Sequence, residues 1–248
     1  MNKILVIGTG GTIGSIKDEH IHLDTPFKIL DYINIKDVEF DCVSPFTVLS
    51  ENMSFALWQK LTDYIGSIDF NKYSGAIILH GSDTLHFTGA LLANMFYDKP
   101  IVLVASDKPL EDKSANGFNN FENAVKHIKN GIDKVYISYD GFYRVENKQP
   151  IKNPVLKFKK ILVISPYVGI DYNSYNLSNV DIVLHSMYHS ATAPDHVKMF
   201  IDRCKKSGTE FYFVTENTSA DYESSRNFEN IIFNSTIESA YSRLLLTN

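Results

Sequence analysis

The sequence has little of what several common protein classes require. Its 248 residues include only two cysteines, Cys42 and Cys204, which lie far apart and lack the spacing of a metal site. No disulfide framework is therefore predicted, and we expect both thiols to be buried and inert. No apolar run is long enough to span a membrane. With 24 basic against 29 acidic residues, the net charge of −5 argues against nucleic acid or an anionic membrane as the main partner.

Hydrophobic residues make up 44% of the chain, which is enough to build a core of ordinary size. The chain begins with Met1-Asn2-Lys3 and then enters a predicted strand at once, which leaves no room for a signal peptide. We therefore expect a cytoplasmic protein.

Short apolar runs alternate with longer amphipathic segments along most of the chain. Strands are predicted at residues 3–8, 38–43, 76–79, 100–105, 134–138, 160–164, 180–184 and 210–214. Helices are predicted from residue 25, with Thr25 as a cap, and at 54–65, 88–95, 119–129, 194–205 and 235–246. Residues 15–24 are polar without a clear period and are predicted to form a loop. This alternation is typical of an α/β fold with a parallel sheet.

A polar stretch at residues 143–153, with prolines at positions 150 and 154, is a candidate linker. It divides the chain into an N-terminal α/β domain at residues 1–153, built on a parallel sheet, and a smaller C-terminal α/β domain at residues 154–248.

Two glycine-framed hydroxyl motifs each follow an apolar run. Residues 8–14, Gly-Thr-Gly-Gly-Thr-Ile-Gly, follow the first predicted strand, and residues 80–84, His-Gly-Ser-Asp-Thr, follow the strand at 76–79. The carboxyl ends of parallel strands share one edge of a sheet, where ligands bind. We therefore expect the two motifs to form a single site.

Other interpretations of these motifs remain open. The glycines of the first motif miss the dinucleotide-binding spacing by one residue, so a nicotinamide enzyme is one alternative, and a simple tight turn is another. Ser82 or Asp83 would, on a purely structural interpretation, cap the next helix. His185 and His189, four residues apart on a strand-to-turn segment, are interpreted as a coincidence rather than a metal pair.

The two motifs resemble the T-G-G-T-I and H-G-T-D-T signatures of the bacterial-type L-asparaginases. Further matches follow in order: Ser50-Glu51-Asn52-Met53 ahead of Trp58, Ser114-Ala115-Asn116-Gly117, and the terminal segment at 235–244. The resemblance covers essentially the whole chain. It implies hydrolysis of the side-chain amide of asparagine to aspartate and ammonia, without metal or cofactor, by a homodimer or homotetramer acting on a small-molecule amide.

The resemblance also implies roles for individual residues. Thr12 would be the nucleophile of the first loop, and Ser82 would replace the second catalytic threonine. Asp83 would hold the α-ammonium of the substrate and orient Ser82, and Ser50 would bind the α-carboxylate. The implied catalytic set is Thr12, Ser82, Asp83 and Lys148, with Lys152 as the next choice of lysine, and the implied substrate-binding set is Gly11, Ser50, Glu51, Gly81, Ser82 and Asp83.

This chemistry is coherent in physical terms. A free hydroxyl needs a nearby base to become nucleophilic, and a desolvated lysine can act as that base because burial lowers its pKa. Backbone N–H groups in glycine turns can stabilise the oxyanion. Because serine lacks the methyl group that restricts threonine, we expect Ser82 to keep the chemistry with looser positioning.

The sequence also departs from the family pattern. Residues 15–27 contain no tyrosine to activate the first threonine, and we consider Glu19, His20 and His22 as the proton carriers there. Glu216 or Glu223 would replace the carboxylate that the C-terminal domain normally contributes. The alternatives are therefore an amidase for glutamine, a D-amino acid amide or a peptide-borne amide, or a degenerate member that binds an amino acid without turnover.

Overall fold

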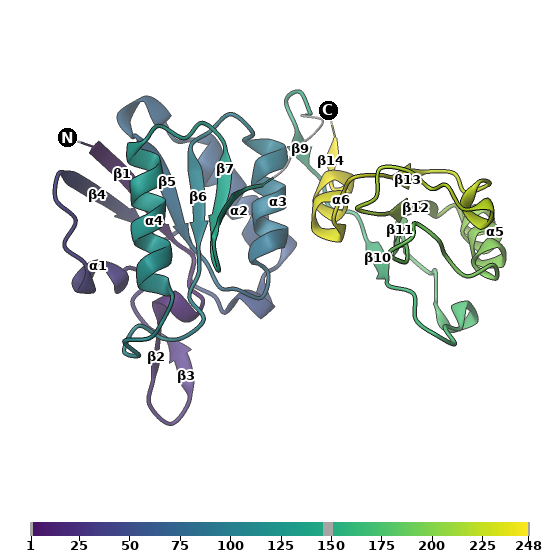
Figure 1. Cartoon of the computed structure of the whole chain (residues 1–248), viewed down its shortest axis with the longest axis horizontal. Helices are drawn as coiled ribbons and strands as arrows, with labels where there is room; N and C mark the ends of the chain where they lie inside the picture. The colour runs from purple at the N-terminus through teal and green to yellow at the C-terminus, as the bar shows by residue number, and fades with distance from the viewer. Residues whose placement is uncertain (1, 146–150, 248) are drawn as a thin grey trace. The chain divides into compact units, whose positions relative to one another are not determined.

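The computed structural model describes residues 2–145 and 151–247 (Figure 1). The chain divides into two compact units, residues 1–153 and 154–248. Both units are α/β, and each contains a sheet of parallel strands, as the sequence predicts.

The first unit is built on a six-stranded sheet with the order β4-β1-β5-β6-β7-β8. Its strands are β1 (Asn2–Gly8), β4 (Val38–Val43), β5 (Gly75–Leu79), β6 (Ile101–Val104), β7 (Val135–Ser138) and β8 (Phe142–Arg144). All neighbours pair in parallel except β7 and β8. The four central strands read as nearly continuous apolar runs because both faces of the sheet are covered by helices.

Helices α2 (Phe55–Gly66) and α3 (Leu85–Met95) cover one face of this sheet, and α4 (Gly117–Lys129) covers the other (Figure 1). Side chains of β5 alternate between the two cores: Ala76 and Ile78 pack toward α2 and α3, whereas Ile77 and Leu79 pack toward α4. This period of two follows from the pleat of a strand. The same alternation turns the side chain of the next residue, His80, toward α2 and α3.

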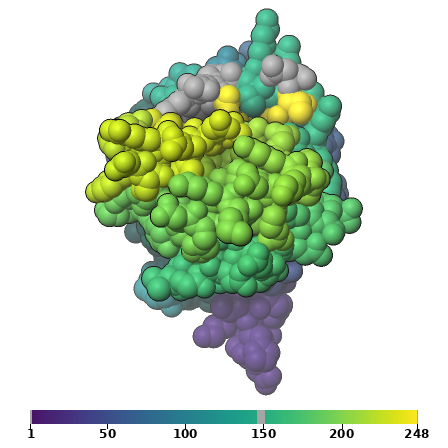
Figure 2. Space-filling model, turned by 90° about the vertical axis from the view of Figure 1, so that its right-hand side faces the viewer, coloured from purple at the N-terminus to yellow at the C-terminus, as the bar shows by residue number. Residues whose placement is uncertain are grey.

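The segment at 15–24 is not the loop that the sequence predicts. Ser15–Lys17 (β2) and Ile21–Leu23 (β3) form an antiparallel hairpin, whose two-residue alternation is too short to register as periodicity. The hairpin stands out as a purple projection in Figure 2. The expected helix from Thr25 is also wrong in extent: a turn precedes a single helical turn, α1 (Ile29–Tyr32), and Thr25 does not cap it.

The second unit has a four-stranded parallel sheet with the order β10-β11-β12-β13. Its strands are β10 (Ile161–Ile164), β11 (Ile182–Ser186), β12 (Glu210–Val214) and β13 (Ile231–Ile232). Helix α5 (Val197–Ser207) packs on one face, and α6 (Ile237–Leu244) packs on the other. Thr236 caps α6 by accepting a hydrogen bond from the Ser239 N–H.

The end of the chain differs from the expected helix at 235–246. Helix α6 stops at Leu244, and β14 (Leu246–Thr247) instead pairs antiparallel with β9 (Val155–Leu156), so the two ends of the unit are joined. Local sequence carries no signal for such a long-range pairing. Burial raises the pKa of Cys204 to about 11, in keeping with an inert thiol, but Cys42 is exposed on edge strand β4, contrary to expectation. Among the described residues, no helix combines the length and apolar character needed to cross a membrane.

Candidate active site

Register places the two motifs at the same edge of the first sheet. Gly8 pairs with Leu79, Leu79 with Val104, and Val104 with Ser138, so four parallel strands end in one row. The backbone continues this contact beyond the strands, because the Thr9 N–H donates to the Leu79 carbonyl at 3.0 Å. The loops that follow the four strands therefore leave the sheet side by side.

Gly11 and Gly81 bring the two motifs into direct contact. A Cβ atom built on Gly11 would overlap the backbone of Gly81, and one on Gly81 would overlap the side chain of Ser50. Gly11 also has a left-handed φ of 78°. Glycine is thus required at both positions for close approach of the backbones, which accounts for the glycines without a dinucleotide.

Ser50 connects a third segment to the second motif. It begins the short 3-10 helix Ser50–Asn52, is buried, and donates a hydrogen bond from its hydroxyl to the Asp83 carboxylate at 3.3 Å. The Thr84 hydroxyl donates to the Ser50 carbonyl at 2.9 Å. These two contacts account for the polar side chains of Asp83 and Thr84, since neither Ser82 nor Asp83 caps helix α3.

The site residues expected from the sequence differ in exposure. Thr12 starts the 3-10 helix Thr12–Gly14 and is half-buried, as is Ser82, whereas Asp83 and Glu51 are exposed. Lys148, the expected assisting lysine, lies outside the described residues. The structure thus brings the Thr12 and Ser82 loops together with Ser50 and Asp83.

Tyr139 is a site residue that sequence patterns did not indicate. It directly follows β7, as His80 directly follows β5, and its ring packs on the α2–α3 side of the core. Burial and the Asp140 charge raise the pKa of Tyr139, and a side-chain hydrogen bond with Ser82 opposes that rise. Its position directly after a predicted parallel strand is the sequence feature that could have indicated Tyr139.

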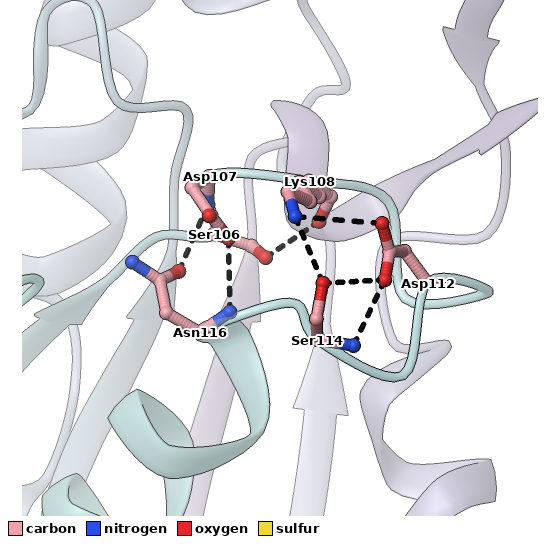
Figure 3. A network of polar contacts seen from close by, with 6 residues as sticks. All are labelled: Ser106, Asp107, Lys108, Asp112, Ser114 and Asn116. Atoms are coloured by element: carbon pink, nitrogen blue, oxygen red, sulfur yellow. Dashed lines mark hydrogen bonds and ion pairs between the residues drawn. The ribbon is translucent and has the colours of Figure 1, made fainter.

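The loop after β6 is held by a network of polar contacts, shown in Figure 3. Asp107 and Asn116 exchange two hydrogen bonds of 2.9 Å between backbone N–H and side-chain oxygen. The Asn116 amide also donates to Asp140 at 2.9 Å. Lys108 binds Ser114 at 2.8 Å and Asp112 at 3.6 Å, so this lysine is paired within its own loop. The network ties the end of β6 to the end of β7, beside Tyr139.

The three proton carriers considered for the hairpin, Glu19, His20 and His22, are all exposed. His22 lies 3.6 Å from Asp18, whose pKa is lowered chiefly by a hydrogen bond from the His20 backbone N–H. The base of the hairpin is fixed to the first motif, because the Ser15 hydroxyl donates to the Gly11 carbonyl at 2.9 Å.

Within residues 2–145 and 151–247, no group of three or more histidine, cysteine, aspartate or glutamate side chains has the arrangement of a metal site. His185 points into the core of the second unit, where its Nε2 bonds the Tyr172 hydroxyl at 2.8 Å and burial lowers its pKa to about 4. His189 is exposed and contacts Ser190 instead. Glu216 and Glu223 are exposed in the same unit.

Comparison with curated proteins finds relatives of the first unit. The chain is 31% identical over 152 residues to a glutamyl-tRNA(Gln) amidotransferase subunit of Methanosphaera stadtmanae, covering 56% of this chain and 33% of that protein. The same-named protein of Sulfolobus acidocaldarius is 32% identical over 131 residues, covering 46% of this chain and 28% of that one. The chain therefore spans about a third of the length of these curated relatives.

Solved structures match the fold of nearly the whole chain. L-asparaginase I of Vibrio cholerae superposes with a TM-score of 0.76 at 20% identity, covering 98% of this chain and 92% of that one. A probable cytoplasmic L-asparaginase of Campylobacter jejuni gives a TM-score of 0.78 at 19% identity, covering 99% and 94%. A family model described as Asparaginase, N-terminal, matches residues 3–141, more than half of the chain. The chain therefore belongs to the asparaginase family.

Proposed function

We propose that the chain hydrolyses a small amide at the Thr12 and Ser82 loops, with L-asparagine as the first substrate to test and L-aspartate and ammonia as products. The single observation that carries the proposal is the contact of Gly11 with Gly81, which sets both hydroxyl loops at one sheet edge. Family membership and the fold of the two asparaginases support it.

In this proposal the Thr12 hydroxyl attacks the side-chain amide carbon to form a tetrahedral intermediate, and its proton is transferred to the amide nitrogen. The C–N bond then breaks, ammonia leaves, and water hydrolyses the resulting ester. Backbone N–H groups of the glycine turns stabilise the oxyanion. Asp83 holds the substrate ammonium, and Ser50 binds its carboxylate. Gly11, Glu51 and Gly81 complete the proposed substrate-binding set. Lys148 remains the proposed assisting lysine of Ser82.

The choice of amide is a separate part of the proposal. The hairpin carries no tyrosine, and the curated relatives are named as glutamyl-tRNA(Gln) amidotransferase subunits, so glutamine is the second substrate to test. D-Amino acid amides and peptide-borne asparagine are the next substrates to test. A chain that binds an amino acid without turnover would be the degenerate form of the same site.

The test is ammonia release by the purified chain from asparagine, glutamine, a D-amino acid amide and an asparaginyl peptide. Turnover of asparagine supports the first choice, and turnover of another member of the panel corrects the substrate alone. Absence of turnover with measurable aspartate binding by calorimetry would establish a binding protein and overturn hydrolysis. Light scattering on the same sample tests the proposed homodimer or homotetramer.

A further inference from the structure

His80 is a buried polar residue that the proposed chemistry does not use. Its backbone N–H continues the sheet by donating to the Val104 carbonyl at 2.9 Å, so the alternation of β5 turns its side chain toward α2 and α3. The side chain is fully buried. Burial of a polar ring costs free energy unless each nitrogen finds a partner.

The hydrogen-bond partners of His80 fix the donor and the acceptor of each hydrogen bond in the series that links Trp58, Thr88 and His80. A carbonyl only accepts, so Nδ1, 2.8 Å from the Gly81 oxygen, must carry the proton. Burial lowers the pKa of His80 to about 4, so the ring is neutral near pH 7 and Nε2 accepts. The Thr88 hydroxyl therefore donates to Nε2 at 3.0 Å, and the Trp58 indole N–H donates to the Thr88 oxygen at 2.9 Å.

This series of hydrogen bonds ends at the Gly81–Ser82 peptide unit, which is part of the loop that holds the Ser82 hydroxyl. The Gly81 carbonyl and the Ser82 N–H belong to one planar group that also contains the Ser82 Cα. Holding the carbonyl toward the buried face turns the Ser82 N–H the opposite way. Gly81 has no side chain of its own to fix this plane, and Gly11 and Ser50 occupy the space where one would lie.

We propose that Trp58, Thr88 and His80 form a positioning relay that sets the Gly81–Ser82 peptide, and with it the Ser82 hydroxyl and N–H. The inference rests on the proposed function, because it assigns the relay to the same amide-hydrolysing site. None of the three side chains reacts with substrate. A purely structural role, in which the relay only fastens α2 and α3 to the sheet, predicts a loss of stability without a change in turnover.

Two substitutions of His80 separate these roles. In His80→Asn the side-chain N–H₂ lies where Nδ1 was and still reaches the Gly81 carbonyl, whereas in His80→Gln it lies where Nε2 was and reaches only Thr88. Loss of the Gly81 bond should lower kcat for His80→Gln by about tenfold, with little change in KM, while His80→Asn stays within about threefold of wild type. Equal losses in both variants would overturn the relay.

Thr88 provides a second test that leaves His80 in place. Thr88→Val removes the donor to Nε2 and should lower kcat by up to about threefold, and Thr88→Ser should restore it. The matched control is Thr62→Val, since Thr62 is a buried threonine of α2 whose hydroxyl bonds the Gln59 carbonyl within its own helix. If kcat falls in Thr62→Val as it does in Thr88→Val, at matched loss of thermal stability, the role is structural.

A readout without turnover separates failure of this inference from failure of the proposed function. Imidazole ¹⁵N NMR should find His80 as the Nδ1–H tautomer and uncharged above about pH 5. The Ser82 amide resonance should shift in His80→Gln and stay in place in Thr62→Val. An Nε2–H tautomer, or an unmoved Ser82 amide, overturns the relay. If both NMR results are as expected but the wild type hydrolyses no amide, the relay stands and only the proposed amide hydrolysis is overturned.

Discussion

The Ser50 hydroxyl donates a hydrogen bond to the Asp83 carboxylate at 3.3 Å, although 33 positions separate the two residues in the chain. In the proposed substrate complex, these two groups bind the opposite charges of one amino acid. The bond orients both before substrate arrives, so the recognition of the α-carboxylate and α-ammonium is partly preorganised.

Ser50→Ala tests this recognition. Loss of the hydroxyl removes a donor to a charged group, so KM for the amide should rise by about tenfold or more, while kcat changes less. Steady-state kinetics on the best amide of the panel give both constants. Ser44→Ala is the control, because Ser44 is an exposed serine in the connection between β4 and α2 whose hydroxyl bonds Phe46 and Thr47 in its own turn. Equal effects of the two substitutions would contradict the assignment of Ser50.

Tyr139→Phe tests the site residue that sequence patterns did not indicate. Removing the hydroxyl that bonds Ser82 should lower kcat by about three- to tenfold without unfolding the protein, because the ring stays in its core position. Tyr136→Phe removes a hydroxyl from β7 itself, on the opposite face of the sheet, and should leave kcat unchanged. An unaltered kcat in Tyr139→Phe would remove Tyr139 from the site.

Because Gly11 contacts Gly81, we expect a single methyl group added at position 11 to reduce the free energy of unfolding strongly. Gly11→Ala should reduce the free energy of unfolding by about 1–3 kcal/mol more than Gly131→Ala, because overlap with another backbone is added to the strain of a left-handed residue. Gly131 is the matched control, since its φ of 81° is close to that of Gly11 but no atom lies near its Cβ position. Urea denaturation measures both, and equal costs would argue against close packing of the two loops.

His185 predicts a pH dependence of stability in the second unit. Burial lowers its pKa from 6.5 to about 4 in the folded chain, so the unfolded chain binds the proton more readily between these values. The free energy of unfolding should therefore be highest above about pH 6.5 and fall as the pH drops toward 4, by up to about 1.4 kcal/mol per pH unit from this group. His185→Gln should reduce that slope in urea titrations across this range. An unchanged slope would contradict a neutral buried ring.

Sequence pattern alone predicts the framework that positions the site, because that framework depends on local properties. The apolar runs of β1 and β5 end in glycine motifs, and parallel pairing brings those ends together. Hydrophobic period also indicates α2 and α4.

What the sequence does not reveal depends on contacts between distant residues. The β2–β3 hairpin and the pairing of β14 with β9 involve two or three residues a strand, too few for a periodic signal. The approach of Tyr139 to Ser82 follows from register across β5, β6 and β7 rather than from any motif. His80 belongs to a recognised motif, yet its relay to Thr88 and Trp58 becomes visible only when α2 and α3 are placed on the sheet.

The most direct test of the central claim is ammonia release by Thr12→Ala and Ser82→Ala beside wild type, with Thr218→Ala, an exposed threonine of the second unit, as the control. If the two hydroxyl loops form one amide-hydrolysing site, each of the first two variants should lose activity by about a hundredfold or more while unfolding as wild type does, and Thr218→Ala should keep full activity. Full activity in both Thr12→Ala and Ser82→Ala would contradict the account.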